Sequence, residues 1–192
     1  MAAPTLRART FPISTAEAAV DTDAERIGVI AGSGVISTGD GNELDFGDVN
    51  ISGGAADSLV KMLILDITAD GGNDTAENFK IWASSNGLDD GDSVVNIQPL
   101  SGADQGTPTL TENYIVDAEV ADYTWAEIPS SEPATNIYRS DETGVLDISG
   151  GASDDAIMLA MYIHIAAGET LGTYKGLDAG NEFRLSVKFT YA

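Results

Sequence analysis

The chain contains no cysteine, and this absence removes several kinds of chemistry at once. It excludes a disulfide framework, a thiolate nucleophile and any metal site built on cysteine. Histidine is nearly absent as well, with His164 as its only representative. A hydrolase triad would have to be built around that ring, and no G-x-S-x-G elbow or comparable context accompanies it. We therefore expect His164 to be structural and the protein to be non-enzymatic, with no catalytic residue.

Long apolar runs are also missing. The longest, Ala156–Ala167, has about a dozen residues and includes His164, whereas a membrane-spanning helix needs about 20. Residues 1–10 lack the apolar stretch of a secretory signal. We therefore expect a soluble chain that is made in the cytoplasm and has no membrane partner.

Basic residues are scarce, with 9 lysines and arginines against 31 aspartates and glutamates and a formal net charge of −22. Such a surface repels the phosphates of nucleic acids and the head groups of anionic lipids. A nucleic-acid partner is therefore not expected. Two explanations of the charge stay open: life in salty water, where ions screen the self-repulsion, and solubility alone.

Acidic loops are plentiful and raise the question of calcium, which prefers six to eight oxygen ligands. None of the loops has the EF-hand spacing, and Asp and Gly are ordinary turn residues. We expect solvated turns, and predict no metal site and no cofactor. The loops in question are Asp40-Gly41-Asn42-Glu43, Asp70-Gly71-Gly72-Asn73-Asp74 and Asp89-Asp90-Gly91-Asp92.

Short β-branched runs separated by glycine-rich turns dominate the rest of the chain, which has 21 glycines. Residues 183–191 alternate apolar and polar side chains, which is typical of a strand with one buried face. The nearly continuous apolar run 59–67 indicates a central strand covered on both faces. Further strands are predicted at 27–30, 35–36, 44–51, 79–82, 94–97, 114–120, 123–128, 145–148 and 157–165.

Only one weak helix signal is present, a capping-box pattern at 14–20. The sequence therefore predicts an all-β protein, an antiparallel β-sandwich of Ig-like or jelly-roll-like type. We assign the sandwich to a single domain at residues 27–192.

A repeat lies inside this domain, because Ile-Ser-Gly-Gly-Ala occurs at Ile51–Ala55 and again at Ile148–Ala152. Each copy is followed by an acidic residue, an apolar run, a polar loop and an alternating strand. This similarity predicts an internal duplication, with pseudo-repeated halves at about 44–97 and 141–192. Coincidence is the alternative, since Gly-Gly turns are common in β proteins.

Residues 1–26 are predicted to form an extended arm, because prolines interrupt them and regular patterning is weak. Arginines give this segment a basic character that the body of the chain lacks. An arm of this kind could bind an acidic neighbour, including another copy of the chain. The predicted assembly contacts are Arg7, Arg9, Phe11 and Ile13.

The segment from Ile163 to Gly176 contains Ala-Gly-x-x-x-Gly-Thr-Tyr-x-Gly and leads into the last strand. It resembles the closing hairpin of Ig-like domains on microbial surfaces and virions. About 30 residues take part in the resemblance.

The resemblance implies a structural protein of a tailed virus, either a capsid decoration protein or a tail component. Its partners would be capsid or tail subunits and other copies of itself as a homo-oligomer, and it would enter the virion in the host cytoplasm. The alternative is an extracellular or cell-surface β-sandwich module, such as a filament subunit or an adhesin-type domain that binds carbohydrate or calcium.

Overall fold

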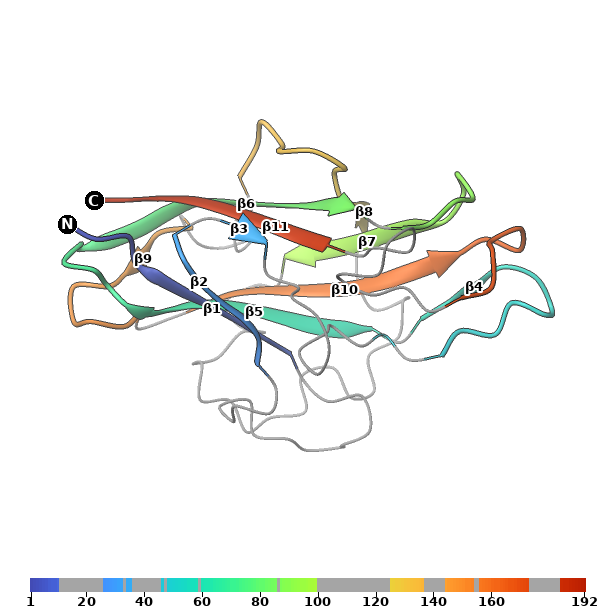
Figure 1. The fold of residues 1–192 in the computed structure, drawn as a ribbon, viewed down its shortest axis with the longest axis horizontal. Helices are drawn as coiled ribbons and strands as arrows, with labels where there is room; N and C mark the ends of the chain where they lie inside the picture. Colours follow the sequence, from blue (N-terminus) through green and yellow to red (C-terminus); the bar gives the residue numbers. More distant parts are fainter. Residues whose placement is uncertain are drawn as a thin grey trace.

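A computed structural model describes residues 1–10, 26–32, 34–35, 46, 48–58, 60–85, 87–99, 125–136, 144–153, 156–172 and 184–192. Every regular element in these ranges is a β-strand, and all strand pairs are antiparallel (Figure 1). None of the described segments is a helix of the length and apolarity that crossing a membrane requires. The prediction of an all-β antiparallel fold is therefore confirmed.

The strands form two sheets. Sheet A has the order β2 (Arg26–Ala31), β1 (Thr5–Thr10), β5 (Lys61–Ala69), β10 (Ile157–Ile165), β7 (Val94–Pro99) and β8 (Ala126–Glu127), and β4 (Ala56–Asp57) also pairs with β10. Sheet B has the order β3 (Gly34–Val35), β11 (Arg184–Tyr191), β6 (Thr75–Ser85) and β9 (Leu146–Asp147). Figure 1 shows the two sheets as stacked layers.

The hydrophobic core lies between the sheets, because alternate residues of each strand point to the same face. Sheet A contributes Leu63, Leu65 and Ile67 of β5, and sheet B contributes aromatic rings. The rings of Phe79 and Phe189 stack with centroids 5.1 Å apart. This arrangement is a β-sandwich.

Strand β5 is buried on both faces, as its continuous apolar run predicted. Leu63, Leu65 and Ile67 face the core, while Ile64 on the opposite face is also fully buried. The bounds of β10 match the predicted strand 157–165. The alternation in β11 is confirmed for the core residues Leu185, Val187 and Phe189, which are buried, but Ser186 on the opposite face is buried too and Tyr191 is exposed.

Other strands differ from their predictions. Strand β6 begins at Thr75 rather than Phe79 and contains a bulge, where Asn78 has a φ of 58° and the pairing with β11 shifts register. Within the described part of the predicted strand 123–128, residues 125–128, only β8 is a strand, and residues 46 and 48–51 form no strand. The strand predicted at 114–120 and the helix predicted at 14–20 lie outside the described residues.

The predicted closing hairpin is wrong. Strands β10 and β11 belong to different sheets, so the chain between them crosses the sandwich. Strands β5 and β6, which are joined by the turn at residues 70–74, also belong to different sheets. A local pattern identifies two successive strands but not their partners, and here each strand pairs with one far away in the sequence.

The two copies of the repeat form the same turn. The N–H of Gly54 donates to the carbonyl of Ile51 at 3.1 Å, and the N–H of Gly151 donates to the carbonyl of Ile148 at 3.0 Å. Both glycines have positive φ, at 128° and 104°, which glycine adopts readily. This similarity covers the turns, and duplication of whole halves stays a prediction.

Candidate functional site

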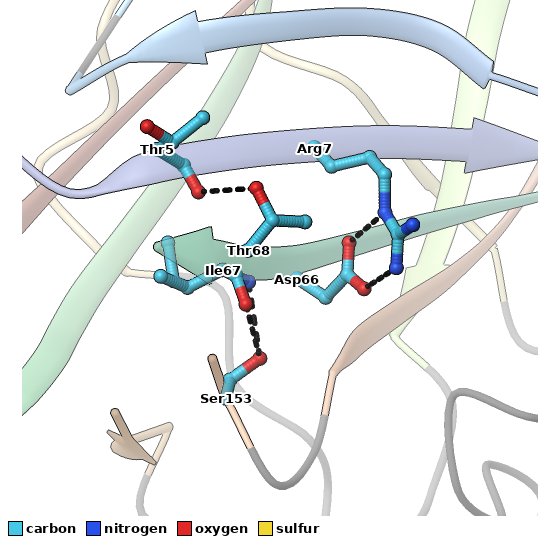
Figure 2. A network of polar contacts seen from close by, with 6 residues as sticks. All are labelled: Thr5, Arg7, Asp66, Ile67, Thr68 and Ser153. Atoms are coloured by element: carbon cyan, nitrogen blue, oxygen red, sulfur yellow. Dashed lines mark hydrogen bonds and ion pairs between the residues drawn. The ribbon is translucent and has the colours of Figure 1, made fainter. Parts of the chain in front are cut away.

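The predicted assembly contact Arg7 lies inside sheet A. Strand β1 runs between β2 and β5, and Leu6 and Ala8 are fully buried in the core. On the opposite face, Nε and Nη2 of Arg7 donate to the two carboxylate oxygens of Asp66 at 3.1 and 2.6 Å (Figure 2). The side chain of Asp66 is only 4% exposed, against 26% for Arg7. A two-point contact of this kind fixes the orientation of both side chains.

Further hydrogen bonds hold this part of the sheet together (Figure 2). The hydroxyl of Thr68 donates to the carbonyl of Thr5 at 3.4 Å. On the other side of β5, the hydroxyl of Ser153 accepts from the N–H of Ile67 at 3.0 Å, and the Ser153 N–H donates to the Ile67 carbonyl at 2.8 Å.

The extended arm predicted at residues 1–26 is not confirmed. Residues 5–9 pair with strands on both sides, and Arg7 contacts a residue of its own chain. Arg9 lies in the same strand, opposite Ile64 of β5, while Phe11 and Ile13 lie outside the described residues. Alternation of Leu6 and Ala8 with Arg7 and Arg9 was the signal that could have identified this strand.

The acidic loop at residues 89–92 is organised by hydrogen bonds. The Glu169 carboxylate, on a residue that is 5% exposed, accepts from the N–H groups of Asp89 and Asp90 at 2.9 and 3.2 Å. Asp89 in turn accepts from the Thr170 hydroxyl at 2.6 Å, and this bond is the main cause that lowers the pKa of Asp89. The loop therefore pairs its carboxylates with donors from the chain itself.

The acidic loop at residues 70–74 is also organised by hydrogen bonds within the chain. Asp70 accepts from the N–H of Gly72 at 3.0 Å, and the buried amide of Asn73 donates to the carbonyls of Ala2 and Asp70. The loop 40–43 lies outside the described residues. Within the described ranges, no group of three or more His, Asp or Glu side chains is arranged to hold a metal ion.

His164 lies on the outer face of sheet A, where its Nδ1 is 2.6 Å from Oδ1 of Asp57 on the paired strand β4. A histidine oriented by an aspartate is two-thirds of a hydrolase triad. The third member would be a hydroxyl nucleophile. The hydroxyl of the neighbouring Ser58 does not take this place, because it accepts from the N–H of Ile163 at 2.8 Å. In the part of the chain that is described, no hydroxyl is hydrogen-bonded to the imidazole.

A basic surface occurs on the outer face of sheet B. Lys188 of β11 lies directly opposite Lys80 of β6, and Arg184 is on the same face of β11. Glu132 bridges the two lysines, with its carboxylate 2.9 Å from Nζ of Lys188 and 3.3 Å from Nζ of Lys80. Hydrogen bonds first from Lys188 and then from Lys80 hold the pKa of Glu132 below its ordinary value. We call Lys80, Arg184 and Lys188 the basic face.

Glu132 belongs to a strap, residues 129–136, that lies over the outer side of sheet B (Figure 1). The strap is fixed at its start by a hydrogen bond from the Ala83 N–H to the Pro129 carbonyl at 2.9 Å. At its end the Asn136 amide donates to Oδ1 of Asn78 in the β6 bulge at 3.0 Å. Pro129 and Pro133 are typical of a loop, but the lysine bridge depends on strand pairing that the local sequence does not reveal.

No protein-family model matches the chain, and searches of curated proteins and of solved structures find no match.

Proposed function

We propose that the protein is a non-enzymatic structural protein that assembles with protein partners in a virus particle, either decorating a capsid or contributing to a tail. The observation that carries the proposal is the basic face of sheet B on a chain with a net charge of −22. A sandwich with a basic surface suits docking onto an acidic protein surface. The viral setting comes from the sequence of residues 163–176 alone, which resembles virion and cell-surface sandwich domains although β10 and β11 do not pair as a hairpin.

The basic face takes the role that the sequence assigned to Arg7. Both Arg7 and Lys188 pair with a carboxylate of their own chain, but the Arg7–Asp66 side chains are 26% and 4% exposed, whereas those of Lys188 and Glu132 are 49% and 40% exposed. Copies of this chain are themselves acidic, so a second copy is a partner of the right charge. Complementary charge of this kind raises the rate and specificity of association more than its final strength.

The assembly proposal is tested by sedimentation velocity of the full chain across ionic strengths. Raising the salt from about 0.01 M to about 1 M shortens the screening length from about 30 Å to about 3 Å, so charge-driven association should weaken. Lys188→Glu should weaken it at low salt, while Lys188→Arg, the matched control, should retain it. A monomer under every condition, or association that Lys188→Glu leaves unchanged, would contradict assembly through this face.

The viral setting needs a separate experiment. Particles purified by density gradient from the source culture can be analysed by mass spectrometry for peptides of this chain. We expect the chain to travel with the capsid proteins through the gradient. Its absence from the particle band would overturn the virion assignment and leave the extracellular alternative.

A further inference from the structure

Two buried polar side chains lie side by side on the outer face of sheet A. Tyr162 of β10 and Asn96 of β7 are directly paired across the strands, and each residue is only 9% exposed. Neither the Tyr162 hydroxyl nor the Asn96 amide forms a hydrogen bond with any described residue. Buried polar side chains are nearly always hydrogen-bonded in folded proteins, so an unpaired pair calls for an explanation.

An equivalent position on the other side of sheet A holds a polar pair that is hydrogen-bonded. Strands β5 and β10 are paired around Leu63 and Leu159, which lie opposite each other. Asp66 follows Leu63, and Tyr162 follows Leu159, by the same number of residues, so the two occupy equivalent positions. The outward neighbour of Asp66 is Arg7, and the two bind each other through two hydrogen bonds. The outward neighbour of Tyr162 is Asn96, and they make no such contact. The polar groups at this second position therefore keep hydrogen-bonding capacity that no described residue uses.

Side chains suited to ligand recognition surround the pair. The ring of Trp125 packs edge-on against Tyr162, with centroids 4.7 Å apart and an interplanar angle of 71°. Glu127 lies opposite Asn96 on the neighbouring strand β8, and its residue is exposed. We call Asp57, Asn96, Trp125, Glu127, Tyr162 and His164 the β10 cluster.

The charges of the β10 cluster restrict what it can bind. Burial, and then the nearby charge of Asp57, raise the pKa of Tyr162, so its phenol keeps its proton and can donate a hydrogen bond. Asp57 and Glu127 supply carboxylate acceptors, and the only base, His164, already contacts Asp57. A phosphate or carboxylate would meet repulsion at these acids.

The cluster thus offers donors, acceptors and an aromatic surface together. The Asn96 amide can donate and accept, the Tyr162 hydroxyl can do both, and the carboxylates can only accept. A sugar has matching chemistry, because each hydroxyl donates and accepts while the C–H face of the ring packs on an aromatic side chain. Small-molecule sites combine apolar surface with a few placed polar groups in the same way.

We propose that the β10 cluster binds a neutral saccharide, with Asn96 and Tyr162 hydrogen-bonded to its hydroxyls and Trp125 packed against its ring. Asp57 and His164 would form the polar rim on one side, and Glu127 the rim on the other. The proposal is independent of assembly through sheet B, since the site lies on the outer face of the opposite sheet.

The test uses tryptophan fluorescence and NMR spectra of the side-chain amide groups, both recorded on the full chain. Trp82 and Trp125 are the two tryptophans of the sequence, so a Trp82→Phe variant reports on Trp125 alone. We would titrate it with glucose, galactose, mannose, N-acetylglucosamine and their short oligomers. At least one should shift the Trp125 emission and the side-chain amide signals of Asn96.

Two variants separate binding from folding. Tyr162→Phe removes only the hydroxyl and Asn96→Val removes the amide, so each should weaken saccharide binding about 10-fold. Because each also removes an unpaired buried polar group, the melting temperature should stay equal or rise by about 2–4 °C. The matched control Trp82→Phe should bind as the parent protein does.

Three results would overturn the proposal. One is that no saccharide in the panel perturbs Trp125 or Asn96. Another is that a quaternary ammonium such as choline binds while every saccharide fails, which would make the acids a cation site. The third is that Tyr162→Phe and Asn96→Val both lower the melting temperature and leave saccharide binding unchanged.

Discussion

Lys80 and Lys188 face each other directly across β6 and β11, and the carboxylate of Glu132 lies between their ammonium groups. Like charges opposite each other destabilise a pair of strands. The strap therefore neutralises a repulsion that the sheet itself creates. The effect is modest because all three groups are partly exposed and screened by solvent.

The lowered pKa of Glu132 predicts a pH dependence of stability. A carboxyl whose pKa is lower in the folded state stabilises the fold above its ordinary pKa of 4.5, and that contribution is lost as the pH falls through the lowered value. Asp147, whose pKa is lowered first by the Ser149 hydroxyl and then by the Ser149 N–H, acts in the same direction. Urea unfolding between neutral and strongly acidic pH should show the loss.

Glu132→Gln provides the control for this pH dependence. It removes the titrating group and keeps the shape of the side chain, so its stability should be lower than that of the parent near neutral pH and should fall less on acidification. A Glu132→Gln profile that runs parallel to the parent profile would contradict the role of the lysine bridge.

The ion pair between Arg7 and Asp66 should show strong coupling. Arg7→Met leaves the buried Asp66 carboxylate without its guanidinium partner, and we expect a loss of about 3 kcal/mol in the free energy of unfolding. The double variant Arg7→Met with Asp66→Leu should recover much of that loss, because no unpaired charge stays buried. Urea unfolding of the two single variants and the double variant gives the coupling energy, and a value near zero would argue against a buried pair.

Gly71 should tolerate no side chain. Its φ is 63°, and a Cβ atom there would come within 3.0 Å of backbone atoms of Ala2 and Ala3. Gly71→Ala should therefore lower the free energy of unfolding by about 2–3 kcal/mol. Gly53 is the matched control, since a Cβ atom there would meet nothing within 4 Å. Equal thermal stability of Gly71→Ala and Gly53→Ala would refute the predicted close approach.

Ser58 and Ser153 make equivalent bonds to the two central strands, and their loss should have similar effects. Each hydroxyl accepts from a strand N–H, that of Ile163 for Ser58 and that of Ile67 for Ser153. Replacing either serine by alanine leaves an N–H without its acceptor and should cost about 1–2 kcal/mol of unfolding free energy. Hydrogen exchange at Ile163 should accelerate in Ser58→Ala only, and at Ile67 in Ser153→Ala only.

Much of the sandwich could be predicted from local patterns, because alternation and continuous apolar runs report which faces of a strand are buried. Strand β10 was predicted with its observed bounds, and the two-sided burial of β5 was anticipated. The bulge at Asn78 could not be predicted, since it depends on how β6 pairs with a strand more than 100 residues away. For the same reason, the pattern showed neither that Arg7 meets Asp66 nor that Tyr162 meets Asn96.

The candidate sites could largely not be predicted from the sequence. Lysine, asparagine and tyrosine are common surface residues, and only strand register brings Lys80 to Lys188 or Asn96 to Tyr162. The prediction that arginines near residue 7 contact a partner protein used charge alone. Charge does not reveal that a buried carboxylate of the same chain lies opposite, and that pairing decides where Arg7 points.

The crossing of the chain between the sheets has a consequence for how the protein is made. Strand β1 must wait for β5, more than 50 residues later, before its second neighbour exists, and β6 must wait for β11. Contacts so distant in sequence slow folding, because loops must close before the contacts can form. During synthesis the apolar faces of the early strands therefore stay uncovered until residues 184–191 have left the ribosome, and in that interval the nascent chain is most exposed to aggregation.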